Sequence, residues 1–369
     1  MRVSEDLEDA DEMVDGNLET GLLTDLAPHR ILKVFAGLDV APGHRPQSPR
    51  GLLVSPHHQQ RAVPHDDRAD AEPGAFHETT RLAAMELRHA RGTLALDHCA
   101  VMGIVNRTPD SFYDGGRMGF DETIAHAEKL AAEGADVLDV GAVKAGPGEE
   151  VSAEEEARRL LPIVEDLATR TNVPISVETS RPEVADAAVA AGAGLVNDVG
   201  GLSDDELAAV CADTGAAIVL MHHGGQVRGR PRNPRYGDVV AEVAAELQAL
   251  AERVRARGVP GDGIVIDPGL DFNKTTFHSL ELVRRLDELT GLGYPLLLAP
   301  SRKDVVGEAL GVPPEQRLEG TLALVALAVA KGAALVRVHD VAPTVRVVHT
   351  VEAVMGLRAP EAPVRGLWE

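Results

Sequence analysis

Residues Val101 to Gly116, VMGIVNRTPDSFYDGG, join a short apolar run to a polar loop. The apolar half has the length and composition of a buried strand. The polar half carries Asn106, Thr108 and Asp110, followed by further hydroxyl, carboxylate and glycine residues. A strand that ends in an amide, a hydroxyl and a carboxylate is typical of the catalytic end of an enzyme barrel. The rest of the chain repeats this order of apolar strand, polar strand end and helix.

Eight apolar runs of this kind alternate with helical sequence. We predict strands at Val101–Val105, Val137–Gly141, Ile175–Glu178, Leu195–Asp198, Ala217–Met221, Ile264–Asp267, Leu296–Ala299 and Val336–His339. Ser-x-x-Glu pairs beginning at Ser152, Ser180 and Ser203 predict helix starts, because they match the capping box. Ahead of the strands, the alternation in residues 85–100 predicts a β-hairpin. Eight strands with helices between them over about 250 residues predict a (β/α)8 TIM barrel, with a doubly wound open sheet as the alternative.

The first 80 residues differ in composition from the rest. Nine carboxylates lie between Glu5 and Asp25, and Pro, His, Gln and Arg dominate residues 42–73. Such a segment buries too little apolar surface to offset its ordering entropy. We therefore predict a disordered acidic extension over residues 1–80, a barrel over residues 85–357 and a C-terminal tail over residues 358–369.

The charge and composition limit the partners. The net charge of −22 argues against nucleic acid and anionic membrane surfaces as partners. No apolar run is long enough to span a bilayer, and the acidic N-terminus lacks the pattern of a signal peptide. Only two cysteines occur, Cys99 and Cys211, without metal-ligand spacing. These features predict a soluble, cytoplasmic protein.

Polar side chains end every predicted strand. In chain order they are Asn106; Asp139; Glu178 and Thr179; Asn197 and Asp198; His222 and His223 after Met221; Asp267; Ser301, Arg302 and Lys303; and Arg337 and His339. The carboxylates and amides can accept hydrogen bonds from the N–H groups of a flat heterocycle, and the cations of the last two strands can bind a phosphate or diphosphate. The residues alone predict recognition of an N–H-rich ring that carries an anionic leaving group.

Seven motifs resemble the dihydropteroate synthase family. In order they are MGIVNRTPDSFYDGG, ISVETS, VNDVGG, LMHHGG, DPGLDFNK, SRKDVVG and RVHDV, within residues 101–356. The resemblance implies a (β/α)8 barrel and a transferase of folate biosynthesis. That family condenses (7,8-dihydropterin-6-yl)methyl diphosphate with 4-aminobenzoate to dihydropteroate and releases diphosphate.

The resemblance also implies roles for individual residues. Asn106 would hold Mg²⁺ and the diphosphate, and Arg337 and His339 would grip the diphosphate. Substrate contacts would come from residues on the other strand ends, namely Asp139, Glu178, Asn197, Met221, Asp267, Phe272 and Lys303. Asn106, Lys303, Arg337 and His339 would be the catalytic residues. Helices late in such barrels often dimerise, and the apolar run of residues 318–330 predicts a homodimer.

The chain departs from the family pattern at three places. The family has Gly-Gly-Glu-Ser-Thr-Arg-Pro-Gly after the second strand, whereas residues 141–148 read GAVKAGPG. Glu178 replaces an aspartate, and Asn273 replaces a glycine. These differences leave a second hypothesis open, a pterin-binding paralogue without efficient 4-aminobenzoate condensation that uses another acceptor or serves as a non-catalytic partner. A third, a pterin-dependent methyltransferase, fits less well, because a methyl carrier needs no diphosphate clamp.

Overall fold

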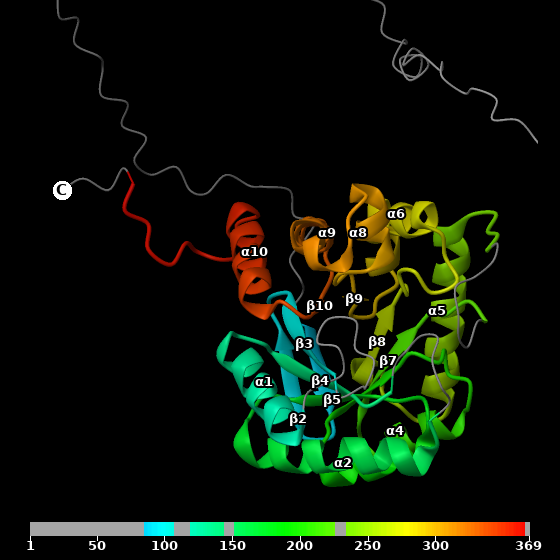
Figure 1. The fold of residues 1–369 in the computed structure, drawn as a ribbon. Helices are drawn as coiled ribbons and strands as arrows, with labels where there is room; N and C mark the ends of the chain where they lie inside the picture. The colour runs from blue at the N-terminus through cyan, green and yellow to red at the C-terminus, as the bar shows by residue number, and fades with distance from the viewer. Residues whose placement is uncertain (1–84, 107–118, 144–150, 226–233, 366–369) are drawn as a thin grey trace, which may run out of the picture. The chain divides into compact units, whose positions relative to one another are not determined.

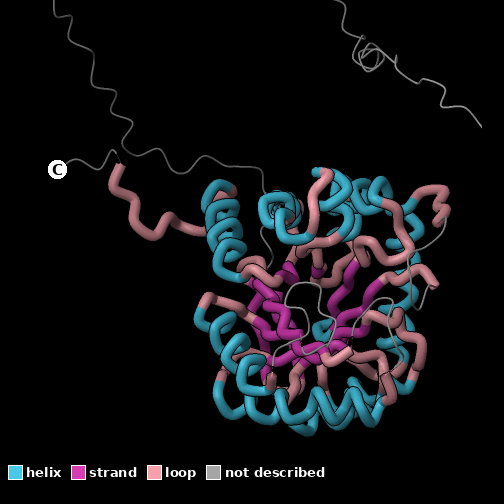
Figure 2. The backbone as a smooth tube through the Cα atoms, in the orientation of Figure 1, coloured by secondary structure: helices cyan, strands magenta, loops and turns pink. Residues whose placement is uncertain are grey.

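The computed structural model describes residues 85–106, 119–143, 151–225 and 234–365 (Figure 1). The predicted extension over residues 1–80 lies outside the described residues, as do the end of the predicted tail and most of the loop that follows the second barrel strand. Within the described part, parallel strands form a ring that helices surround, as Figure 2 shows. The predicted (β/α)8 barrel is therefore confirmed.

The predicted strands and hairpin are all present. The strands are β1 (Met85–His89), β2 (Gly92–Leu96), β3 (Ala100–Asn106), β4 (Val137–Gly141), β5 (Ile175–Glu178), β6 (Leu195–Asp198), β7 (Ala217–Met221), β8 (Ile264–Asp267), β9 (Leu297–Leu298) and β10 (Leu335–Val338). Strands β1 and β2 pair antiparallel as the predicted hairpin. Strand β9 is shorter than predicted, and β10 ends one residue before His339.

The eight parallel strands close on themselves. Their order is β8-β7-β6-β5-β4-β3-β10-β9, and a parallel bridge from Ile266 of β8 to Leu296 joins the two ends of the sheet. The backbone N–H of Ile266 also donates to Pro295 O at 2.9 Å. Closure brings the carboxyl ends of all eight strands to one mouth, which is where barrel enzymes place their active sites.

The helices are α1 (Phe120–Ala132), α2 (Ala153–Arg170), α3 (Pro182–Ala191), α4 (Glu206–Thr214), α5 (Val239–Ala256), α6 (Thr276–Arg284), α7 (Leu286–Thr290), α8 (Asp304–Leu310), α9 (Leu318–Ala330) and α10 (Val341–Val354). Ser152 caps α2 as predicted, since its hydroxyl accepts from Glu155 N at 3.2 Å. The other two predicted caps are wrong: the caps are Arg181 for α3 and Asp205 for α4. Across the described ranges, no helix has the length and apolar character needed to cross a membrane.

Two layers of apolar side chains stabilise the barrel. A large cluster lies between the sheet and the helices. A smaller interior core fills the barrel and consists of Leu87, Leu96, Ala100, Met102, Val137, Leu195, Ala217, Val219, Val265, Leu297, Ala334 and Leu335. Because Leu87 and Leu96 belong to the hairpin, β1 and β2 pack against the amino ends of the barrel strands. The opposite end of the barrel is left for polar side chains.

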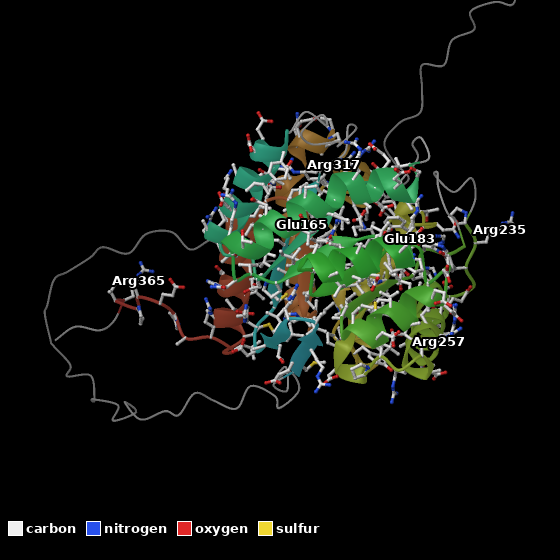
Figure 3. All side chains as sticks on the ribbon, turned by 90° about the horizontal axis from the view of Figure 1, so that it is seen from below. Glu165, Glu183, Arg235, Arg257, Arg317 and Arg365 are labelled. Atoms are coloured by element: carbon white, nitrogen blue, oxygen red, sulfur yellow. The ribbon has the colours of Figure 1, made fainter. Side chains whose placement is uncertain are left out.

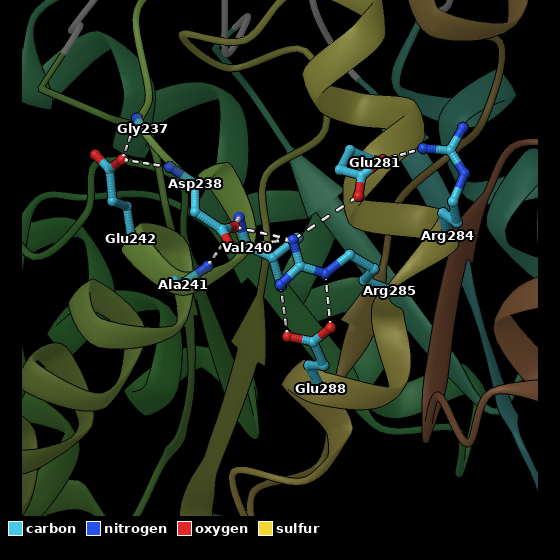
Figure 4. Close-up of polar contacts among 9 residues, drawn as sticks. All are labelled: Gly237, Asp238, Val240, Ala241, Glu242, Glu281, Arg284, Arg285 and Glu288. Atoms are coloured by element: carbon cyan, nitrogen blue, oxygen red, sulfur yellow. Dashed lines mark hydrogen bonds and ion pairs between the residues drawn. The ribbon is translucent and has the colours of Figure 1, made fainter.

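Charged side chains tie the outer helices together. Asp238 caps α5 by accepting from Val240 N and Ala241 N at 3.0 and 3.1 Å. Arg285 bonds the same carboxylate at 3.0 Å and also pairs with Glu288, so the start of α5 is bound to the junction of α6 and α7 (Figure 4). Elsewhere charged groups such as Arg257 point away from the barrel (Figure 3).

Candidate functional site

The candidate site consists of the side chains that face the barrel interior where the strands end. Side chains alternate between the two faces of a strand, so a residue two positions after an interior-core residue faces the interior as well. Five strands show this relation. In each pair that follows, the first residue belongs to the interior core and the second is the site residue: Val137 and Asp139, Leu195 and Asn197, Val219 and Met221, Val265 and Asp267, and Leu335 and Arg337. Strand alternation therefore brings five of the predicted site residues to one end of the barrel interior, which we call the pocket.

Asp139 is fully buried and bonds two other residues of this group. Its Oδ2 accepts from Asn197 Nδ2 at 2.9 Å and from Arg337 Nε at 2.6 Å. Arg337 NH2 donates to Glu178 Oε2, also at 2.6 Å. Within the described part of the chain, Asp139 Oδ1 is buried without a hydrogen-bond partner. A buried acceptor of this kind is costly unless a donor satisfies it, so the pocket is suited to a ligand with N–H groups.

Burial disturbs the ionisation of two further carboxyls. Burial raises the pKa of Glu178 to about 7. The charge of Arg337 lowers this pKa, and the charge of Asp139 raises it by a smaller amount. Burial also raises the pKa of Asp267, whereas Lys303 and the backbone N–H of Gly269 lower it. That N–H donates to Asp267 Oδ1 at 2.7 Å. A donor or cation bound to either carboxyl would favour its charged form and lower its pKa.

Lys303 approaches the pocket from the loop after β9. Its Nζ donates to Leu270 O at 2.9 Å and lies 5.1 Å from the centre of the Phe272 ring. Burial lowers the pKa of Lys303, and Asp267 opposes that change. The lysine lies beside the aromatic ring, and the charge of Lys303 also acts on the Asp267 carboxylate.

His339 is oriented by Ser301. The two side chains share a hydrogen bond of 2.8 Å between Nδ1 and Oγ, and His339 N donates to the same oxygen at 3.1 Å. Arg302 does not join them at the pocket as its place beside Lys303 suggested. Its φ of 54° turns it toward Asp340, with which it forms two hydrogen bonds of 2.9 and 3.0 Å.

Asn106 lies at the end of β3, beside Gly141 of β4. A Cβ atom on Gly141 would lie 3.3 Å from Asn106 Oδ1 and 3.7 Å from Glu178 Cβ. The glycine therefore leaves space between the amide and the carboxyl, which a side chain would narrow. Residues 107–118, which follow Asn106 in the sequence, and residues 144–150 lie outside the described residues.

The role of Lys274 was not predicted. This lysine is 5% exposed, and its Nζ contacts His222 Nδ1 at 2.7 Å, Phe272 O at 2.9 Å and Gly269 O at 3.0 Å. Burial lowers the pKa of Lys274 to about 7 and that of His222 to about 3. Since Met221 faces the interior, His222 faces outward and packs. The sequence feature that could have indicated this role is the motif DPGLDFNK, which ends in Lys274.

Comparisons with known proteins agree with this geometry. A family model described as pterin binding enzyme matches residues 102–339. A Mycobacterium leprae protein named inactive dihydropteroate synthase 2 is 48% identical over 281 residues, covering 74% of this chain and 97% of that protein. Dihydropteroate synthase of Bacillus subtilis is 41% identical over 258 residues, covering 69% and 88%.

Solved structures show the same similarity. Yersinia pestis dihydropteroate synthase with a sulfonamide drug complex matches with a TM-score of 0.71 and 39% identity, covering 74% of this chain and 100% of that one. Xanthomonas albilineans dihydropteroate synthase with 4-aminobenzoic acid matches with a TM-score of 0.68 and 42% identity, covering 76% and 100%.

Proposed function

The chain belongs to the pterin binding enzyme family, and on that premise we propose that its pocket binds a reduced pterin. The observation that carries the proposal is the buried acceptor set of Asp139, Glu178, Asn197 and Asp267. Carboxylates and amides at these positions match the 2-amino and ring N–H groups of a pterin. The proposed reaction is condensation of (7,8-dihydropterin-6-yl)methyl diphosphate with 4-aminobenzoate to dihydropteroate, in folate biosynthesis.

The diphosphate would bind beside the ring, to Arg337, His339 and Asn106. Among the described residues no three His, Cys, Asp or Glu side chains cluster closely enough to hold a metal. An amide oxygen is a ligand that Mg²⁺ accepts, so Asn106 is the described residue that would help to hold it. When bound, Mg²⁺ would offset the negative charge of the diphosphate.

The chain's own residues would act mainly by placement and charge. Arg337 and His339 would stabilise the diphosphate as the bond from its oxygen to the pterin methylene breaks and the electron pair leaves with that oxygen. Lys303 and Asp267 would hold the ring while the 4-aminobenzoate nitrogen forms the new bond and loses a proton to water. No covalent bond to the protein is required.

A second candidate function is pterin binding without efficient 4-aminobenzoate condensation. Residues 141–148, GAVKAGPG, lack the hydroxyl and guanidinium groups expected after the second strand. A relative at 48% identity also carries the name inactive dihydropteroate synthase 2. Losing one charge-assisted contact costs about 1.5–3 kcal/mol, and this loop loses several.

Diphosphate release from (7,8-dihydropterin-6-yl)methyl diphosphate, with and without 4-aminobenzoate, separates the two candidates. We expect slow release that 4-aminobenzoate accelerates, and faster release in the variant Lys144→Ser, Ala145→Thr, Gly146→Arg. Release at the same rate with and without 4-aminobenzoate, in both proteins, would favour the second candidate. Failure of the diphosphate substrate to bind would contradict both.

We also propose a cytoplasmic homodimer. Both cysteines are free and buried, which suits a reducing compartment. Helices α6, α8 and α9 contact one another, and each carries an exposed apolar side chain: Phe277 is 82% exposed, Leu310 53% and Leu327 48%. Light scattering should give the mass of two chains, and Leu327→Glu should shift it toward one. A wild-type mass of one chain would contradict the dimer.

A further inference from the structure

The guanidinium of Arg337 is hydrogen-bonded to two of the acceptors that we assign to the pterin. Its Nε donates to Asp139 Oδ2 and its NH2 to Glu178 Oε2, each at 2.6 Å. The side chain of Arg337 is 16% exposed and those of its partners are 0% and 8% exposed. These are charge-assisted hydrogen bonds at short range inside a buried site.

A guanidinium and the edge of a pterin are chemically alike. Each is planar and presents adjacent N–H donors, so each can bond two carboxylates at once. Arg337 and a pterin that used Asp139 and Glu178 would therefore need the same oxygens. Asp139 Oδ1, buried without a partner in the described residues, could take a donor without displacing Arg337. Asp139 Oδ2 already accepts from Asn197 and Arg337, so a ring donor there would displace one of them.

We infer that Arg337 is a specificity-determining residue that fills the pterin site from within and leaves it when an anion binds. The guanidinium cannot be withdrawn without a new partner, because an unpaired buried charge is strongly destabilising. An anion beside His339 supplies that partner and frees the two carboxylates for ring N–H groups. A pterin that carries its own diphosphate is thereby selected over one that does not.

This inference rests on the proposed function and adds a coupling between two parts of one ligand. If the anion and the ring bind through the same movement of Arg337, each must strengthen the binding of the other by the same factor. Couplings of this kind commonly amount to about fivefold or more. If Arg337 were only an anion ligand, removing it would leave the binding of an uncharged pterin unchanged.

The test uses 6-hydroxymethylpterin, which has no phosphate, and inorganic diphosphate with Mg²⁺. The affinity of the full chain for the pterin is measured by fluorescence titration, with and without saturating diphosphate. We expect wild type to bind the pterin at least about fivefold more tightly with diphosphate. Arg337→Ala should bind the pterin alone more tightly than wild type does and should lose the effect of diphosphate.

Two further variants complete the test, one that retains the charge of Arg337 and one that serves as a control. Arg337→Lys retains the charge but cannot span both carboxylates, so it should bind the pterin alone more tightly than wild type with a smaller effect of diphosphate. Arg235→Ala removes an exposed arginine that points away from the barrel (Figure 3) and should match wild type.

Three results would overturn the inference. The first is wild-type pterin affinity that diphosphate leaves unchanged or weakens. The second is an affinity of Arg337→Ala and Arg337→Lys for the pterin alone that is no higher than that of wild type. In both cases pterin binding itself would stand, so the proposed pocket would survive. The third is no pterin binding by any of the four proteins, which would overturn the proposed function as well.

Discussion

Glu178 shows how one buried carboxyl links the site to pH. Its folded pKa of about 7 lies above the ordinary glutamate value of 4.5, so the folded state holds this proton more tightly than the unfolded chain does. The stabilisation that results is fully present below the unfolded pKa and is lost as pH rises through about 7. Burial causes this shift, because the pocket cannot solvate the charged form.

We predict that Glu178→Gln removes this pH dependence. The free energy of unfolding of wild type, relative to the variant, should fall between pH 4.5 and 7. The change should be on the order of 1–3 kcal/mol, measured by urea denaturation at several pH values. A difference between the two proteins that stays constant over this range would show that Glu178 does not titrate as described.

The sequence predicted which residues meet in the pocket but not how they bond. Asp139, Asn197 and Asp267 could be placed because strand ends and alternation are local patterns. The bonds from Arg337 to Asp139 and Glu178 join residues 198 and 159 positions apart. Such contacts depend on which strands become neighbours when the barrel closes, and on side-chain length, so no local pattern contains them.

Among the elements of the site, the loop from β8 to α6 depends on two lysines. Lys274 bonds the carbonyls of Gly269 and Phe272, and Lys303 bonds the carbonyl of Leu270 between them. These bonds add donors to three carbonyls of the loop, of which Gly269 O also accepts from Phe272 N at 3.1 Å. Asp267 begins this loop and Phe272 lies within it, so the lysines fix the distance between two predicted substrate contacts.

We predict that Lys274→Met destabilises the chain by about 2–4 kcal/mol, because buried carbonyls and His222 lose their donor. The midpoint of urea denaturation measures this loss. Lys129→Met is the matched control, since Lys129 is 69% exposed and its one ion pair among the described residues is with Glu133, across one helical turn. This change should alter stability by about 0.5 kcal/mol or less. Equal effects of both substitutions would contradict the role of Lys274.

Helix starts were less predictable than strands. The capping-box pattern was right at Ser152 and one residue early at Ser180, because Pro182 takes the first helical position and makes Arg181 the cap. Helix α4 likewise begins after Asp205 rather than Ser203. The strands could be placed well because a run of buried apolar residues is a stronger signal than a single polar cap.

For the whole molecule, the described barrel begins at the β1–β2 hairpin. Among the described residues, the interior core and the closed sheet form from this hairpin onward. We predict that deleting residues 1–80 lowers the melting temperature by less than about 2 °C, which corresponds to under about 1 kcal/mol. Calorimetry of both proteins tests this; a loss of many degrees would mean that the segment stabilises the barrel.

The central claim is that the carboxyl ends of the barrel strands bind a reduced pterin. The most direct measurement is calorimetric titration of wild type and Asp267→Asn with (7,8-dihydropterin-6-yl)methyl diphosphate and Mg²⁺. The amide keeps the size of the carboxyl but turns N–H donors toward the donors of the ring, so affinity should fall at least about tenfold, or about 1.4 kcal/mol. Asp262→Asn, an exposed matched change, should bind as wild type does. Equal affinities of Asp267→Asn and wild type would contradict the claim.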